Sequence, residues 1–129
     1  KVHTLKARIS QIKIIQAGES VSYNRSFVAD KEMKIAILSI GYADGLPRNS
    51  GTKRVSVNIK SQTAPILGIV CMDLCMIDVS NVPDCKVGDE VEIFGKQQPI
   101  EILANACETI PYEILCGISP RVKRIFIKD

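Results

Sequence analysis

Apolar and polar residues alternate over several short segments of this chain. The pattern is clearest in residues 1–16, where single polar residues separate Leu5, Ala7 and Ile9. Side chains two apart in a β-strand lie on the same face, so the alternation predicts a long half-buried strand with a bulge near Ile14. Alternation or short apolar runs predict further strands at residues 20–27, 54–59, 64–70, 74–79, 90–94 and 121–127.

Residues 35–40 form an apolar run without alternation, which is typical of a strand buried on both faces. The run ends at Gly41 and Gly45, and these glycines predict a turn that needs a positive φ or a close backbone approach. A strand that ends in such a turn would hold Tyr42 and Asp44 at fixed positions on the rim of the fold. An ordinary exit from a strand into a loop accounts for the same residues.

Two segments near the C-terminal end have the pattern of short helices. Residues 99–107 carry apolar side chains at helical spacing. Residues 109–117 have Pro111 where a first helical turn would lie and Gly117 where the helix would stop. Together the segments predict one mainly β domain over residues 1–129, a closed or partly open barrel of about eight strands with two short helices.

Composition supports a folded domain and gives little reason to expect a nucleic-acid partner. The chain has 129 residues, 46% of them hydrophobic, so it is long enough and apolar enough to bury a core. The net charge of +3 is small, and the basic residues are scattered. A modest basic cluster at Arg121, Lys123, Arg124 and Lys128 is predicted to be the solvated face of a closing strand.

The cysteine and histidine content argues against a metal site. The five cysteines include no C-x-x-C pair, and His3 is the single histidine. We expect reduced thiols and a cytoplasmic location. No apolar run reaches transmembrane length and no signal peptide is visible. Because the sequence opens on Lys1, we expect it to be a piece of a longer protein.

The polar residues that stand out as candidates for chemistry are three tyrosines and one carboxylate: Tyr23, Tyr42, Tyr112 and Asp73. They do not make a nucleophile assembly, and no glycine-rich phosphate loop precedes a helix. The residues alone therefore predict a β domain that contributes groups to a site completed elsewhere.

Four sequence blocks resemble the C-terminal domain of alanine racemases, the pyridoxal-phosphate enzymes that interconvert L- and D-alanine. They are GESVSY at 18–23, SIGYADG at 39–45, GIVCMD at 68–73 and TIPYE at 109–113. The tail ISPRVKR at 118–124 is similar in order and spacing. Four blocks in series, spread over nearly the whole chain, make the resemblance specific.

The resemblance implies partners that this chain lacks. In that family an N-terminal TIM-type barrel carries the cofactor on a lysine, and the β domain packs beside it. The enzyme is a head-to-tail homodimer, in which the β domain of one subunit completes the site of the other. We therefore expect the isolated chain neither to bind pyridoxal phosphate tightly nor to racemise an amino acid substrate.

Tyr23 resembles the second acid/base of the family, acting on the face of the substrate opposite the lysine. Racemisation removes a proton from one face of Cα and returns a proton to the other face. Two separate groups do this more simply than one group that must move between the faces. A phenol with an ordinary pKa of about 10 needs nearby positive charge to act as a base at neutral pH. Strand geometry suggests Arg25 as that charge. The alternative is a core tyrosine with a satisfied hydroxyl.

Three further residues match family positions, and Asp73 lies next to one of them. Tyr42 resembles the tyrosine that lines the pocket entrance, and Met72 resembles the residue whose backbone N–H meets the substrate carboxylate. Asp73 is expected to order the same turn, and a turn-capping carboxylate without substrate contact explains it equally well. Tyr112 resembles the tyrosine that hydrogen-bonds the cofactor phosphate, and its place near a helix start suits an anion.

Two departures and two alternatives remain. Asn24 stands where many members have glycine, and Ile69 stands where a basic residue is common. One alternative is the same domain of a membrane-tethered serine racemase of the vancomycin-resistance type, which would be the cytoplasmic part of a membrane protein. The other is a non-catalytic β-barrel dimerisation module. A serine pocket must pair the extra hydroxyl, and the aromatic Tyr112 favours alanine mildly.

Overall fold

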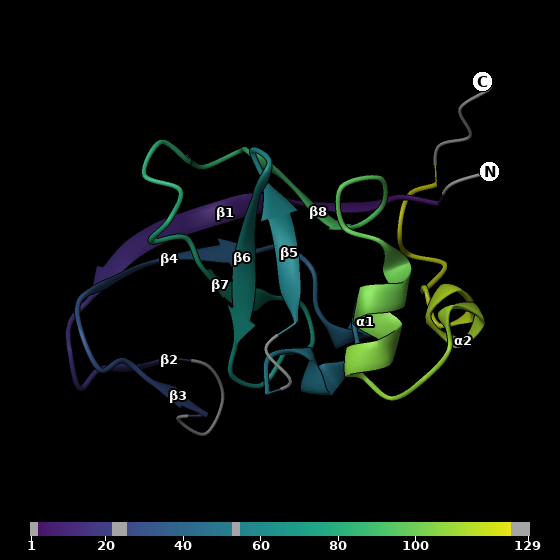
Figure 1. The fold of residues 1–129 in the computed structure, drawn as a ribbon, viewed down its shortest axis with the longest axis horizontal. Helices are drawn as coiled ribbons and strands as arrows, with labels where there is room; N and C mark the ends of the chain where they lie inside the picture. Colours follow the sequence, from purple (N-terminus) through teal and green to yellow (C-terminus); the bar gives the residue numbers. More distant parts are fainter. Residues whose placement is uncertain (1–2, 22–25, 53–54, 125–129) are drawn as a thin grey trace.

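The computed structural model describes residues 3–21, 26–52 and 55–124. Within them, six strands close into a barrel in the order β1-β4-β7-β6-β5-β8, and β2 and β3 form a separate two-stranded sheet (Figure 1). The strands are β1 (Leu5–Ile15), β2 (Ser20–Val21), β3 (Phe27–Val28), β4 (Met33–Leu38), β5 (Ser56–Ile59), β6 (Gln62–Leu67), β7 (Cys75–Asp78) and β8 (Glu90–Phe94). The helices are α1 (Ile100–Ala106) and α2 (Pro111–Cys116), and the 3₁₀ turns are η2 (Tyr42–Asp44) and η3 (Arg48–Ser50). The predicted mainly β barrel with two short helices is confirmed.

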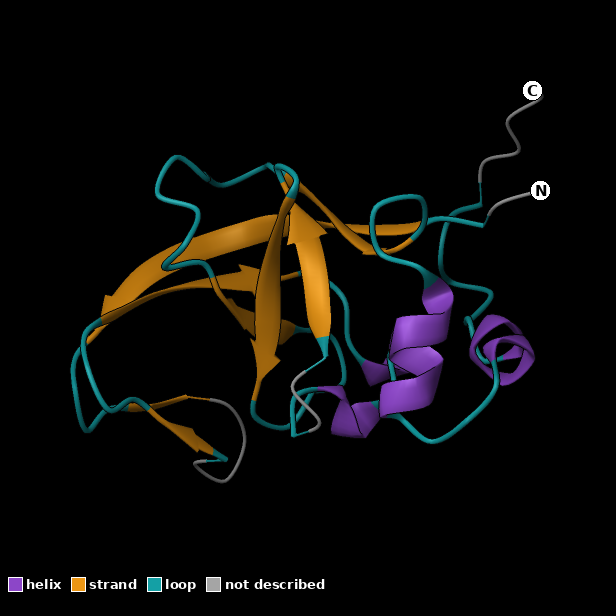
Figure 2. Cartoon of the chain, viewed as in Figure 1, coloured by secondary structure: helices purple, strands orange, loops and turns teal. Residues whose placement is uncertain are grey.

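The barrel interior is filled by side chains that point inward from every strand. Ile77 of β7 and Val57 of β5 are fully buried in this core. Leu103 of α1 and Ile114 of α2 join the same cluster. The two helices lie together at one end of the barrel, and the β2–β3 hairpin lies at the opposite end (Figure 2). Neighbouring barrel strands are all antiparallel, and the six strands close on themselves where β8 pairs with β1.

Strand β4 is buried on both faces, as predicted. Ala36 and Leu38 point into the barrel core, whereas Ile35 joins a second hydrophobic cluster on the outer face. That second cluster comprises Ile15, Val21, Ala29, Met33, Ile35 and Leu67, with Phe27 and Met76 packed against it. The β2–β3 hairpin therefore rests on the outside of the barrel through a small core of its own.

The prediction of one strand over residues 20–27 is wrong. Strands β2 and β3 pair antiparallel, with Val21 opposite Phe27, so the segment is a hairpin. The alternation continues through both arms, and the connecting residues carry neither glycine nor proline, the strongest turn signals. Residues 22–25 themselves lie outside the described part of the chain.

The register of β1 does not shift near Ile14; it shifts between Ile9 and Gln11 against β4, and between Leu5 and Lys6 against β8. The shift at Ile9 has a topological cause, because β1 pairs with β8 through its first residues and with β4 through its remaining ones. A bulge bends a strand, and here it lies where β1 passes from one partner pairing to the other.

The predicted closing strand at residues 121–127 is not seen in its described part. Residues 121–124 form a turn and loop, and the rest lies outside the described residues. In the described residues β1 pairs with β8 through residues 5–8 and with β4 from Ile9 onward, and residues 121–124 join neither ladder. Strand β5 lies between β6 and β8, and its residues alternate between buried and partly exposed, as the alternation of residues 54–59 predicts. No helix in the described ranges is long and apolar enough to span a membrane.

Replacing Ile77 by Val tests the barrel core. Ile77 is fully buried, so loss of one methylene is expected to lower the free energy of unfolding by about 0.5–1.5 kcal/mol. Ile14→Val is the matched control, since Ile14 is 53% exposed and the same change should matter little. Chemical denaturation measures both, and equal losses in the two variants would contradict this account of the core.

Candidate functional site

The turn that follows β4 is stabilised by a hydrogen bond to one of its own side chains and depends on two glycines. The Asp44 carboxylate accepts a hydrogen bond of 2.9 Å from the Gly41 N–H, which closes the turn around Tyr42. A Cβ at Gly41 would lie 2.3 Å from the Cys71 carbonyl oxygen, so only glycine permits this approach. Gly45 has a φ of 115°, a conformation that other residues rarely adopt. Both expected reasons for glycine, close approach and positive φ, are confirmed.

The Tyr42 turn is joined to the turn between β6 and β7 by backbone hydrogen bonds. The Tyr42 N–H donates to the Cys71 carbonyl and the Ala43 N–H donates to the Met72 carbonyl, each at 2.9 Å. Tyr42 and Met72 therefore occupy adjacent turns although 30 positions separate them in the sequence. Both side chains are exposed, by 42% for Tyr42 and 53% for Met72. The Met72 N–H has no acceptor among the described residues, which leaves it available to a ligand.

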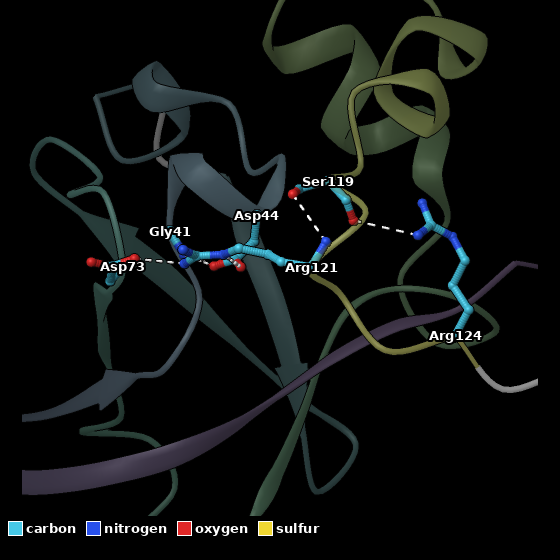
Figure 3. Close-up of polar contacts among 6 residues, drawn as sticks. All are labelled: Gly41, Asp44, Asp73, Ser119, Arg121 and Arg124. Carbon is cyan, nitrogen blue, oxygen red and sulfur yellow. Dashed lines mark hydrogen bonds and ion pairs between the residues drawn. The ribbon is translucent and has the colours of Figure 1, made fainter.

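Arg121 bridges the same two turns with its side chain (Figure 3). Its Nε lies 2.6 Å from a carboxylate oxygen of Asp44, and its Nη2 lies 2.5 Å from one of Asp73. Asp44 is nearly buried, with 13% of its side chain exposed, whereas Asp73 is largely exposed. The hydrogen bond from Arg121 holds the pKa of Asp44 below its ordinary value of 3.8, against the opposing effect of burial, and the Gly41 N–H acts in the same direction.

Helix α2 is attached to these turns through its C-terminal end. A Cβ at Gly45 would lie 2.6 Å from the Gly117 carbonyl oxygen, so the two segments are in close contact. The Ser119 N–H donates to the Asp44 carbonyl at 3.0 Å. Tyr112 lies near the start of this helix and is 72% exposed. A hydrogen bond with Cys116 raises the pKa of Tyr112 above its ordinary value.

A shallow hollow of about 440 Å³ opens beside Tyr42. Arg48, Asn49, Thr52 and Ile69 line it. The Arg48 guanidinium lies over the Tyr42 ring, 5.9 Å from its centroid, which is within range of a cation–π interaction. Ile69, noted as a departure from the family pattern, therefore gives this hollow an apolar wall.

Tyr23 and Arg25 lie outside the described residues, so the expectation that they are neighbours stays a prediction. The chain on either side is well anchored. Val21 is buried in the second cluster, and the Ser26 hydroxyl oxygen accepts a 2.8 Å hydrogen bond from the Ile69 N–H. The β2–β3 hairpin is thus tied to the segment that leads into the Met72 turn.

The structure adds Arg121 and its pairing with Asp44 to the residues expected from the sequence. Arg121 was assigned to a solvated strand face, and that assignment is wrong because its guanidinium binds two carboxylates. A sequence signal existed in the block ISPRVKR, which contains Arg121 and is similar in order and spacing to the family. Its partner could not be inferred, since Asp44 lies 77 positions earlier.

Asp73 was expected to order the Met72 turn. Its described contact is with Arg121, across to a different segment of the chain. Among the described residues no group of three or more His, Cys, Asp or Glu side chains is arranged to hold a metal ion.

The described fold and site define a closed β-barrel domain whose rim carries two coupled turns. The family model for the alanine racemase C-terminal domain matches residues 2–126, and the chain belongs to that family. It is 45% identical over 132 aligned residues to an alanine racemase of Clostridium tetani. That alignment covers 99% of this chain and 34% of the relative.

Solved structures agree with the family assignment. The alanine racemase of Acinetobacter baumannii superposes with a TM-score of 0.87 at 42% identity, over 92% of this chain and 33% of that one. The Bartonella henselae alanine racemase with covalently bound pyridoxal phosphate gives a TM-score of 0.90 at 37% identity, over 96% and 34%. The chain thus spans about a third of the length of the relatives that it matches.

The lowered pKa of Asp44 predicts a specific loss of stability in acid. A carboxyl group whose pKa is lower in the folded state than in the unfolded state stabilises the fold at any pH above its unfolded-state pKa. This stabilisation is lost as the pH falls through the folded-state pKa. Asp44→Asn should therefore cost about 1 kcal/mol near neutral pH. The difference from wild type should shrink below about pH 4.

Urea denaturation from neutral to acidic pH measures this difference. Asp30→Asn is the control, because Asp30 is exposed and forms no ion pair with the described residues. A pH-independent gap between wild type and Asp44→Asn would contradict the assignment.

Proposed function

We propose that this chain is the C-terminal domain of an alanine racemase that interconverts L- and D-alanine with pyridoxal 5'-phosphate. The observation that carries the proposal is the family match over residues 2–126, at an identity of 45% to a relative named alanine racemase. The exposed Met72 N–H and the Tyr42 turn beside it support the proposal from the geometry. The proposed location is the cytoplasm.

The proposed partners are an N-terminal TIM-type barrel of the same protein and a second subunit arranged head to tail. The relatives are about three times as long as this chain, which leaves room for such a domain. Several large apolar side chains are exposed on this domain and are suited to a covering partner: Tyr42, Met72, Ile102, Ile110 and Tyr112.

The residues of this chain fit a peripheral contact with pyridoxal phosphate. Tyr112 is exposed, and a phenol with an ordinary or raised pKa is protonated at neutral pH, so its hydroxyl can donate a hydrogen bond to a phosphate oxygen. Helix α2 has six residues, so its dipole adds little, and the hydroxyl carries this contact. The other cofactor contacts are assigned to the N-terminal domain.

When bound, pyridoxal phosphate withdraws electrons from the substrate Cα and so makes its proton acidic. Tyr23 is proposed to take or return that proton on one face of Cα, and a positively charged Arg25 would lower the pKa of the phenol. The Met72 N–H is proposed to bind the substrate carboxylate. Tyr42, covered by Arg48, would limit the size of what enters, and Asp73 would hold the Met72 turn in place through Arg121.

Replacing Tyr23 by Phe in the full-length protein tests the acid/base assignment. Racemisation should fall by roughly 10²–10⁴-fold, because general acid–base catalysis contributes about that factor. In deuterium oxide the variant should still exchange the Cα hydrogen of one alanine enantiomer, through the base on the other face, without inverting it. Polarimetry and NMR follow the two processes.

Val28→Ala is the control for this experiment, since Val28 is exposed on the same hairpin. It should keep activity within about twofold of wild type. If Tyr23→Phe exchanges the hydrogen of both enantiomers at the wild-type rate, Tyr23 is not the second acid/base.

Mixing separately produced parts tests the partner assignment and the rival functions. This chain alone is expected to show no turnover, and adding the N-terminal barrel should restore racemisation of L-alanine. L-serine is the rival substrate: faster turnover of serine would favour the serine racemase alternative. Failure of the full-length protein to racemise either amino acid would leave the non-catalytic dimerisation module as the better account.

A further inference from the structure

Three segments that are distant in the sequence meet at the Arg121 guanidinium. They are the turn after β4, which contains Tyr42 and Asp44, the turn after β6, which contains Met72 and Asp73, and the segment after α2, which contains Arg121 itself. Figure 3 shows the guanidinium between the two carboxylates. No other described side chain forms ion pairs with both of these turns.

Backbone contacts bring the two turns together, and the bridge adds the ion pairs between their side chains. Two backbone hydrogen bonds join them, from Tyr42 to Cys71 and from Ala43 to Met72. The carboxylates of Asp44 and Asp73 contact neighbouring nitrogens of one guanidinium, so removing the charge would leave two like charges facing each other. Their repulsion would act directly on the two backbone hydrogen bonds.

The chemistry of the bridge requires arginine. Its rigid planar fork places Nε on Asp44 and Nη2 on Asp73, whereas the single ammonium of lysine is a point charge. Arg124 is different, because within the described part of the chain its guanidinium donates to the Ser119 and Ile118 carbonyl oxygens and to neither turn. The chain therefore contains a matched arginine, three positions away, that does not touch the turns.

We propose that Arg121 is a positioning residue that fixes the Met72 turn relative to the Tyr42 turn, and thereby sets the direction of the Met72 N–H. The kinetic consequence rests on the proposed function, in which that N–H binds the substrate carboxylate. The structural consequence, that the turns separate without Arg121, does not depend on it. The side chains of Asp73 and Arg121 are both about half exposed or more, and exposed ion pairs add little to the free energy of unfolding. The bridge therefore acts on local geometry more than on global stability.

Amide hydrogen exchange of the full-length protein tests the structural part, since the Tyr42 and Ala43 amides report the contact between the turns. In Arg121→Gln, exchange in the peptide that contains them should be at least about tenfold faster than in wild type. In Arg124→Gln it should stay within about twofold. Equal exchange in wild type and Arg121→Gln would overturn the proposal, whether or not the protein is a racemase.

Steady-state kinetics of the full-length protein test the positioning role. Arg121→Gln should raise KM for L-alanine by about tenfold or more and lower kcat by less than about threefold, because a carboxylate contact binds ground state and transition state alike. The KM of Arg121→Lys should lie between those of wild type and Arg121→Gln, and the KM of Arg124→Gln should match that of wild type. A lower melting temperature with an unchanged KM would show a merely structural role and would overturn the proposal.

A double variant tests whether the repulsion between the carboxylates is the cause. Asp73→Asn removes one of the two like charges, so Arg121→Gln/Asp73→Asn should exchange more slowly at Tyr42 and Ala43 than Arg121→Gln alone. Faster exchange in the double variant would contradict this origin. If the wild-type full-length protein does not racemise alanine, the proposed function fails, and the exchange measurements still decide the role of Arg121.

Discussion

The close approach of two turns is the constraint on which the rim of this barrel depends. Gly41 lies so near the Cys71 and Met72 carbonyl groups that a single Cβ would meet them at 2.3–2.5 Å. The two backbone hydrogen bonds between the turns need this distance. Every group proposed for the substrate, apart from Tyr23 and Tyr112, lies on one of these two turns. A backbone requirement at one glycine therefore governs the arrangement of several side chains.

Charged side chains strengthen the contact between the two turns that the backbone permits. Asp44 is nearly buried, and burial alone would favour its neutral form. The Arg121 guanidinium and the Gly41 N–H reverse that tendency, so the carboxylate remains ionised and closes its own turn. The same guanidinium reaches Asp73 on the second turn. One charge from the C-terminal segment thus stabilises two loops that the barrel strands only bring near each other.

Much of the fold follows from local patterns, and the errors occur where distant parts of the chain decide. The apolar run at residues 35–40 correctly predicts a strand buried on both faces, because a strand of that kind carries apolar residues at consecutive positions. The strand predicted at residues 121–127 has a suitable pattern, but its described part, residues 121–124, is a turn and loop whose Arg121 pairs with two distant carboxylates. The hairpin at residues 20–28 was missed because two paired arms alternate just as one long strand does.

The candidate site shows the same division. Glycine spacing was enough to predict a special turn around Tyr42, and family resemblance supplied roles for Met72 and Tyr112. The pairing of Arg121 with Asp44 and Asp73 could not be predicted, since residues 77 and 48 positions apart meet only after the barrel closes.

The small cluster beneath the β2–β3 hairpin has a consequence for how this family can diversify. It shares strands β1, β4 and β6 with the barrel core but is packed on the opposite side of the sheet. Substitutions at Val21, Ala29 or Met33 can therefore retilt the hairpin while the barrel interior stays intact. Strands β2 and β3 can in this sense be adjusted separately from the barrel on which they pack.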